Sequence, residues 1–204
     1  MAEDIKGRPQ QRLRTRKDLL SAASRLMRQG GRPSLEDVAA EAMVSRATAY
    51  RYFPDIGALL AEASIDVGVP DAEELFAKEA SQDPVARLEK VDKALHDAVT
   101  EHEPQMRRML AHAVTRCIDA PDDATPPRQN RRLPLIGAAL APARKQFNSV
   151  ALRRLEYALA MIFGTEGVIV AKDVLRIDDA EARRVKRWAI RALVDAARKP
   201  VRGE

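Results

Sequence analysis

Apolar residues recur at helical spacing along most of the 204-residue chain. From Arg14 onward they stand three and four positions apart, which places them on one face of a helix that Gly30-Gly31 would end. A short helix is predicted to begin after the N-cap Ser34, and a second short helix to cover residues 46–53. A fourth helix is predicted after Pro54, which disfavours continuation of the one before it. The first third of the chain is therefore predicted to be a set of helices with short connections.

A second group of helices is predicted beyond a boundary near residue 70. Glycine and proline interrupt the apolar pattern at Gly68–Asp71 and again at Asp83–Pro84. The helices that follow are expected at about residues 84–102, 104–117, 133–146, 149–174 and 179–198. Pro142 is expected to kink the third of these helices. The polar stretch Asp119–Arg132 is the candidate for a disordered loop.

The composition agrees with an all-α fold of ordinary globular type. Hydrophobic residues make up 46% of the chain and charged residues 32%, while only 4% are aromatic. The frequent Ala, Leu, Arg and Glu favour helix over strand. The single cysteine, Cys117, cannot form an intrachain disulfide, and no apolar run has the length of a membrane span or the form of a signal peptide. We therefore expect a cytoplasmic protein without membrane contact.

Positive charge is concentrated near the N-terminus. The chain has 35 Lys and Arg against 30 Asp and Glu, a formal net charge of +5. Residues 1–32 alone hold nine basic and three acidic side chains. An excess of this size permits a polyanionic partner without requiring one. Residues 1–12 are polar and contain Gly7 and Pro9, so they are expected to form a flexible basic arm.

The two short helices after Ser34 have the spacing of a helix-turn-helix. A turn of three or four residues joins them, and in such a unit the second helix enters the major groove of DNA. The second helix carries guanidinium groups, which can bond guanine through two parallel hydrogen bonds, and hydroxyls, which suit phosphate oxygens. Ala47 and Ala49 keep its surface thin. The same spacing occurs in helical corners that bind nothing, and the residue types favour DNA binding.

Residues 34–60 resemble the N-terminal domain of the TetR family of bacterial transcriptional regulators. The positions that carry the resemblance keep the family's spacing without a gap: Val38-Ala39, Val44-Ser45, Thr48-x-Tyr50-x-Tyr52-Phe53 and Leu59. The resemblance covers about residues 14–64. It implies a three-helix helix-turn-helix DNA-binding domain at residues 13–67 and a larger helical effector-binding and dimerisation domain at 68–204. It also implies a homodimeric repressor that binds a pseudo-palindromic DNA operator and is released by a small-molecule effector.

Several residues acquire an expected role from this resemblance. The expected phosphate contacts are Ser34, Ser45, Thr48, Tyr50 and Tyr52. Arg46 and Arg51 are expected to read bases, and Ala47 to allow close approach to the groove. For three basic residues, contact with the flanking DNA and a solvated run of charge are equally open: Arg12, Arg14 and Arg16.

Three positions depart from the family pattern. Met43 stands where the family has a glycine in the turn, and a left-handed backbone there would cost a non-glycine residue about 1 kcal/mol. Ala47 replaces a frequent glycine, which is a mild change because its side chain is small. Ile56 stands in the place of a lysine that contacts a phosphate, so one contact to the DNA backbone is expected to be absent.

The C-terminal region is expected to form the dimer. The helix predicted at 149–174 is apolar over more than one stripe, so it needs cover on several sides, which a partner subunit can supply. The last helix carries another apolar stripe, and two helices from each subunit can form a four-helix interface. The candidate interface residues are Ala160, Gly164, Gly167, Val185, Trp188 and Ala192.

Effector contacts are sought among the Met, aromatic and polar side chains of the C-terminal region. Such side chains at helical spacing more often form core than a ligand pocket. The candidates are Phe76, Met106, Met109, His112, Phe147, Tyr157, Met161 and Glu166. Glu166 interrupts the longest apolar run and needs a partner if it is buried. The residues do not indicate the chemical class of the effector.

Two other classes of protein have less support. An enzyme would draw on His96, His102 and His112, whose spacings of six and ten residues do not place two imidazoles on one helical face. The sequence has no phosphate-binding glycine loop and no nucleophile motif, so we expect no catalytic residues, no metal and no cofactor. The alternative that stays open is a non-specific helical DNA-binding or adaptor protein without an effector.

Overall fold

The computed structural model describes residues 3–119, 128 and 130–198, and every regular element in these ranges is helical. The all-α expectation is therefore confirmed. The chain divides into two compact units, which we call the N-terminal unit (Met1–Gly68 and His102–Gln129) and the C-terminal unit (Val69–Glu101 and Asn130–Glu204). No helix within the described ranges is apolar over a length that would cross a membrane.

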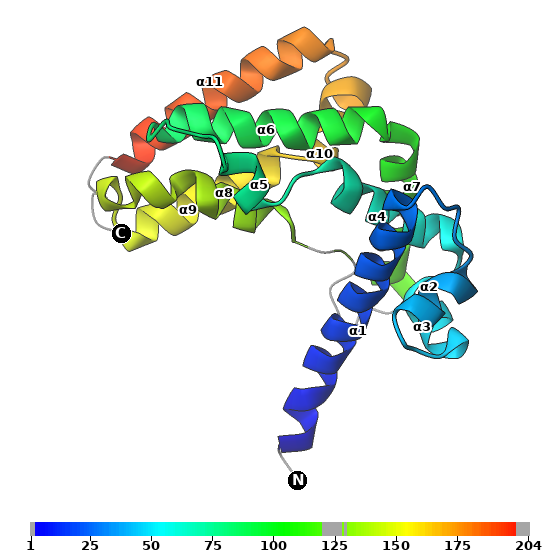
Figure 1. Ribbon diagram of the computed structural model, residues 1–204. Coiled ribbons are helices and arrows are strands. Elements are labelled where there is room, and N and C mark those ends of the chain that lie inside the picture. Colours follow the sequence, from blue (N-terminus) through cyan, green and yellow to red (C-terminus); the bar gives the residue numbers. More distant parts are fainter. Residues whose placement is uncertain (1–2, 120–127, 129, 199–204) are drawn as a thin grey trace. The chain divides into compact units, whose positions relative to one another are not determined.

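The N-terminal unit is built around one long helix. Its helices are α1 (Glu3–Arg28), α2 (Leu35–Glu41), α3 (Arg46–Tyr52), α4 (Ile56–Gly68) and α7 (Glu103–Asp119). Helix α1 contacts α2 and α4, α2 contacts α3, and α4 contacts α7. Figure 1 shows α2 and α3 as a short pair beside the C-terminal part of α1, whose N-terminal turns extend away from them. The two short helices lie where the sequence predicted them.

Two features of this unit differ from the expected organisation. Helix α1 begins at Glu3, so residues 3–12, for which a flexible basic arm was expected, are helical. Each residue other than proline that is added to an existing helix gains one backbone hydrogen bond, which favours extension of a helix whose other half is already packed. Helix α7, expected in the domain at 68–204, contacts α4 within the N-terminal unit instead. The expected loop Asp119–Arg132 lies largely outside the described residues.

The core of the N-terminal unit forms where α1, α2, α3 and α4 meet. Its buried apolar side chains are Leu19, Leu20, Ala22, Ala23, Leu35, Val38, Ala39, Ala49, Tyr52, Phe53, Leu59 and Ala63. Phe53 directly follows α3 and is 1% exposed. Burial of a side chain the size of Phe or Leu contributes about 1.5–3 kcal/mol. The orientation of α3 is therefore set by this shared core.

A buried ion pair joins α1 to α4. Arg16 donates two hydrogen bonds to the carboxylate of Glu62, the one from Nη1 measuring 2.7 Å, and the two side chains are 5% and 4% exposed. The guanidinium also lies 5.0 Å from the ring centroid of Phe53. Removal of one partner leaves a desolvated charge, which costs about 3–5 kcal/mol. Arg16 is thus a structural residue, and the DNA contact considered for it is wrong.

The C-terminal unit is a bundle in which α6, α8, α9 and α11 contact one another in a closed ring. Its helices are α5 (Ala72–Phe76), α6 (Pro84–Glu101), α8 (Arg132–Leu140), α9 (Ser149–Ile162), α10 (Thr165–Ile169) and α11 (Asp179–Arg198), with a 3-10 turn at Ala141–Gln146 and a π turn at Val170–Val174. Figure 1 shows α6 and α11 side by side. The expected kink at Pro142 is instead the start of the 3-10 turn after α8.

The helix predicted at 149–174 is broken at Gly164. This glycine has a φ of 92°, and a Cβ in its place would lie 2.7 Å from Nε of Arg132. The guanidinium of Arg132 donates from Nη1 to the carbonyl of Ala160 at 2.9 Å and from Nη2 to Glu166. Apolar spacing continues across the break, so periodicity alone did not reveal it.

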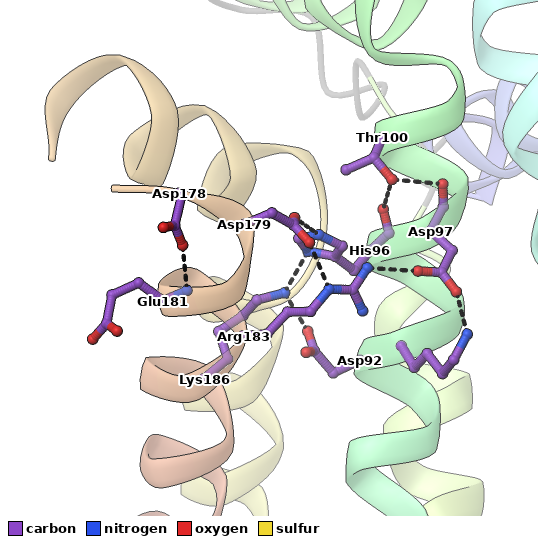
Figure 2. Close-up of polar contacts among 10 residues, drawn as sticks. Asp92, His96, Asp97, Thr100, Asp178, Asp179, Glu181, Arg183 and Lys186 are labelled. Carbon is purple, nitrogen blue, oxygen red and sulfur yellow. Dashed lines mark hydrogen bonds and ion pairs between the residues drawn. The ribbon is translucent and has the colours of Figure 1, made fainter. Parts of the chain in front are cut away.

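A chain of polar side chains joins α6 to α11 inside the C-terminal unit (Figure 2). Lys186 donates a 2.6 Å hydrogen bond to Asp92 and lies 3.0 Å from Nδ1 of His96. The other ring nitrogen of His96, Nε2, contacts Oδ1 of Asp179. His96 is 1% exposed. We call Asp92, His96, Asp179 and Lys186 the His96 cluster.

These contacts assign one protonation state to His96. An ammonium group only donates, so Nδ1 of His96 must accept from Lys186, and the ring proton stays on Nε2, which donates to Asp179. Burial and the charge of Lys186 lower the pKa of His96 below its ordinary value of about 6.5. Arg183, which bonds both Asp179 and Asp97 at 2.8 Å, acts in the same direction. His96 is therefore a neutral bridge between two helices.

We predict that the free energy of unfolding falls as the pH drops from about 7 to 5. The unfolded histidine binds a proton near pH 6.5 and the folded one only at lower pH, so acid favours the unfolded chain by up to about 1.4 kcal/mol per pH unit. Urea unfolding at several pH values measures this slope. His96→Gln should flatten it, whereas His112→Gln, in the N-terminal unit, should not. A slope unchanged by His96→Gln would contradict this assignment.

Candidate nucleic-acid interface

Side-chain caps fix the starts of α2 and α3. Ser34 Oγ accepts from the N–H of Asp37 at 3.1 Å, and the Asp37 carboxylate accepts from the N–H of Ser34 at 2.8 Å, which forms a reciprocal capping box. Hydrogen bonds from Ser34 also lower the pKa of Asp37. Ser45 Oγ accepts from the N–H of Thr48 at 3.1 Å and lies 2.9 Å from its hydroxyl. Both serines are thus confirmed as N-caps, and their phosphate contacts stay predictions.

The turn between α2 and α3 is a Schellman motif with Met43 as its left-handed residue. The N–H of Met43 donates to Ala40 at 3.0 Å, and the N–H of Val44 donates to Ala39 at 2.9 Å. Met43 has a φ of 55°, and its side chain is 92% exposed. Gly30 closes the same motif at the end of α1 with a φ of 80°, which costs a glycine nothing. The turn therefore keeps a left-handed backbone although a methionine occupies it.

Met43→Gly is expected to raise the free energy of unfolding by about 1 kcal/mol, because glycine adopts this backbone without the steric cost of a Cβ. Thermal or urea unfolding measures the change. Met43→Ala is the matched control: it removes the same exposed side chain, keeps the strain, and should change stability far less. Equal stability of the glycine and alanine variants would show that Met43 carries no backbone strain.

The accessible face of α3 carries both arginines that were expected to read bases. Arg46, Ala47, Tyr50 and Arg51 are exposed. Tyr52 is only 6% exposed and packs in the core. Little of its side chain is therefore available for the expected phosphate contact. Cζ of Arg51 lies 5.5 Å from the ring centroid of Tyr52. Arg51 thus lies beside a tyrosine ring.

An acidic residue of α2 also contacts this face. Glu36 Oε1 lies 2.8 Å from Nε of Arg46, and the two side chains are 44% and 66% exposed. Cζ of Arg46 lies 5.4 Å from the ring centroid of Tyr50. A hydrogen bond with Tyr50 and the charge of Glu36 raise the pKa of Arg46. The sequence pattern did not indicate Glu36, because only the packing of α2 against α3 brings it to Arg46.

Further positive charge lies on α1. Arg12, Arg14 and Lys17 are exposed, whereas Arg16 is buried. Arg25 pairs with Glu41 of α2 at 2.8 Å. For Arg12 and Arg14, contact with flanking DNA stays a prediction.

The residues expected to line an effector pocket fall in two different units. Met106, Met109 and His112 lie on α7 in the N-terminal unit, whereas the C-terminal unit holds Phe147, Tyr157, Met161 and Glu166. Met106 and Met109 are buried, and Tyr157 and Met161 are 54% and 74% exposed, so neither pair indicates a pocket within one unit. Helical spacing shows which side chains share a face, but it does not show what that face contacts. The ring centroid of Phe76 lies 3.9 Å from Cζ of the buried Arg87, so a contact inside the chain accounts for the position of Phe76.

Glu166 and two nearby glycines have partners within the chain. Glu166 pairs with Arg132, as a half-buried acid requires. Gly164 and Gly167 were expected to admit a second subunit. Instead, a Cβ at Gly164 would meet Arg132, and one at Gly167 would lie 2.2 Å from the carbonyl oxygen of Ile162. Contacts inside the chain thus account for both glycines, and their place in a dimer interface stays a prediction.

Exposed apolar side chains remain on α9 and α11, which contact each other. Trp188 and Val185 of α11 are 71% and 46% exposed, and Met161 and Tyr157 of α9 are 74% and 54% exposed. Ala192 is exposed as well. Large exposed apolar side chains on two helices in contact indicate a candidate interaction site. We call these five residues the α9/α11 face.

Within the part of the chain that the structure describes, no three His, Cys, Asp or Glu side chains are placed to hold a metal ion.

The helix-turn-helix segment matches a known family in sequence. Residues 19–63 match the TetR_N family model, described as bacterial regulatory proteins, tetR family. No curated protein matches the chain. Among solved structures, the chain is similar to a TetR transcriptional regulator from Rhodococcus sp. RHA1, with 21% sequence identity and a TM-score of 0.47 over 89% of this chain and 96% of that chain. The matched segment contains the whole of α2 and α3.

Proposed function

We propose that this chain, which belongs to the TetR family of bacterial regulatory proteins, is a sequence-specific repressor that binds a pseudo-palindromic operator as a homodimer. Membership of the family makes it a DNA-binding regulator of transcription, and the family match lies in residues 19–63. One observation carries the finer proposal: Arg46 and Arg51 lie on the accessible face of α3, directly after the turn of a helix-turn-helix.

Helix α3 supplies the chemistry that the major groove requires. A guanidinium can donate two parallel hydrogen bonds to O6 and N7 of guanine, and we propose Arg46 and Arg51 for this role. Ala47 is exposed between them, which allows the helix to approach the base edges. Hydroxyl groups suit phosphate oxygens, and we propose Ser34, Ser45, Thr48 and Tyr50 for these contacts.

The charge of the motif favours specific over non-specific binding. Non-specific binding depends on neutralisation of phosphates by Lys and Arg. Residues 33–68 carry six acidic side chains and only two basic ones, Arg46 and Arg51. Affinity of this segment for DNA must therefore come from a few well-placed contacts. The non-specific DNA-binding protein is thus the weaker candidate.

Arg51→Ala is expected to weaken operator binding by about 1–3 kcal/mol and to relax preference at one base pair of each half-site. Selection from a random DNA pool, followed by affinity measurement on the selected sequence, gives both quantities. Arg51→Lys keeps the charge but lacks the planar fork, so it should relax the preference as well. A wild-type selection that returns no symmetric motif would contradict the proposal and support non-specific binding.

We propose the α9/α11 face as the core of the homodimer interface. It is the exposed apolar surface of two adjacent helices, and family membership supports a dimer built there. A dimer places two α3 helices in half-sites about one DNA turn apart, 34–36 Å. The operator would then have the two-fold symmetry of the protein.

Trp188→Glu is expected to weaken self-association by about 30-fold or more, because a buried tryptophan at the centre of an interface contributes about 2 kcal/mol or more. Light scattering over a range of concentrations measures the shift from dimer to monomer. Ile118→Glu on α7 is the matched control, since Ile118 is 72% exposed and lies in the other unit. Dissociation by Ile118→Glu with an intact Trp188→Glu dimer would move the interface to α7.

We further propose that an effector binds the C-terminal unit and lowers the affinity for the operator. Such release requires that the effector bind the DNA-free state more tightly than the DNA-bound one. Phe147 and Glu166 are the contacts we propose within that unit. Regulation of transcription also implies that the protein acts in the bacterial cytoplasm, where the operator is found.

A further inference from the structure

We propose that Glu36 of α2 determines part of the operator preference by holding Arg46 of α3 in one position. The inference rests on the proposed function, because it gives a partner to a residue that we assign to base recognition. It adds a specificity-determining residue that touches no base in the proposal and acts through Arg46.

Two side chains from different helices converge on the Arg46 guanidinium. Nε of Arg46 lies 2.8 Å from Glu36 Oε1 in an ion pair. The same guanidinium lies over the ring of Tyr50, with Cζ 5.4 Å from the centroid. Glu36 comes from α2 and Tyr50 from the next turn of α3, so together they restrict a side chain that is 66% exposed.

The contact with Glu36 is compatible with base recognition by the same arginine. A guanidinium has five N–H donors in one plane, and the ion pair with Glu36 is made at its Nε side. A guanine requires two parallel donors, which Nη1 and Nη2 can provide. Because the ion pair with Glu36 and the ring of Tyr50 restrict this long side chain before DNA binds, its ordering does not oppose binding.

The carboxylate of Glu36 also disfavours contact of Arg46 with a phosphate, which is the contact that non-specific binding would use. If Arg46 moved from Glu36 to a phosphate, the carboxylate of Glu36 would be left without its cation beside a polyanion. Like charges brought together in this way oppose binding, and specific interfaces commonly use such repulsion against wrong modes. Glu36 therefore both orients Arg46 toward the bases and penalises its transfer to the DNA backbone.

Helix α2 offers a matched control in Glu41. Glu41 lies at the other end of the same helix, is 39% exposed where Glu36 is 44% exposed, and pairs with Arg25 of α1 at the same 2.8 Å. Substitution of either acid removes one negative charge from α2. Only substitution of Glu36 releases Arg46.

The test is selection from a random DNA pool with wild type, Glu36→Gln and Glu41→Gln, followed by binding to the selected and to an unrelated duplex at several salt concentrations. Glu36→Gln should lose about tenfold preference at one base pair of each half-site. It should bind the unrelated duplex more tightly, and the slope of log K against log salt should steepen by about 0.9 per subunit as Arg46 takes a phosphate. Glu41→Gln should keep the wild-type preference.

Two further variants separate geometry from charge. Glu36→Asp keeps the charge but shortens the side chain by one methylene, so it should relax the preference without the gain on unrelated DNA. In an Arg46→Ala background, Glu36→Gln should leave the base preference unchanged, because the interaction that it removes is already absent.

Three results would overturn the inference. A wild-type motif that Glu36→Gln leaves unchanged at every position would show that Glu36 does not act on specificity. An equal loss of base preference in Glu36→Gln and Glu41→Gln would show that the loss comes from the change in charge alone. A wild-type selection without any symmetric motif would remove the proposed function itself and, with it, the basis for this role of Glu36.

Discussion

The buried pair of Arg16 and Glu62 is the contact on which the N-terminal unit depends. Two charges withdrawn from water persist only when each neutralises the other in good geometry, so α1 and α4 are held in one relative position. Phe53 lies against the same guanidinium and is the residue at which α3 ends. Isolated helices of seven residues are unstable in water. Helices α2 and α3 therefore owe both their existence and their orientation to this core.

Four acidic residues in and beside the helix-turn-helix have structural tasks. Asp37 closes a capping box, and three glutamates pair with arginines: Glu36 with Arg46, Glu41 with Arg25 and Glu62 with Arg16. A segment with an excess of negative charge can then face DNA, because these charges have partners at close range. Such a surface has little general attraction for phosphate. Contacts on it can therefore favour one DNA sequence over another more than they raise affinity for DNA in general.

Local signals in the sequence predicted the helix-turn-helix well. Ser34, Ser45 and the glycine pair after α1 act through neighbours three to five residues away, so their roles could be inferred from short patterns. The break at Gly164 was not predicted, and the side chain packed against this glycine is that of Arg132, which lies on another helix. The burial of Arg16 and the contact of Glu36 with Arg46 likewise depend on helix packing. The same limit explains why the pattern did not indicate the contact between α7 and α4.

The central claim is that the accessible face of α3 binds DNA, and hydrogen exchange of the backbone amides tests this claim most directly. Amide exchange is recorded with and without a DNA duplex obtained by selection. We expect exchange to slow in residues 34–53, which hold α2, the turn and α3, with the largest effect at the start of α3. Protection confined to α9 and α11, with residues 34–53 unchanged, would contradict the assignment of this face to DNA.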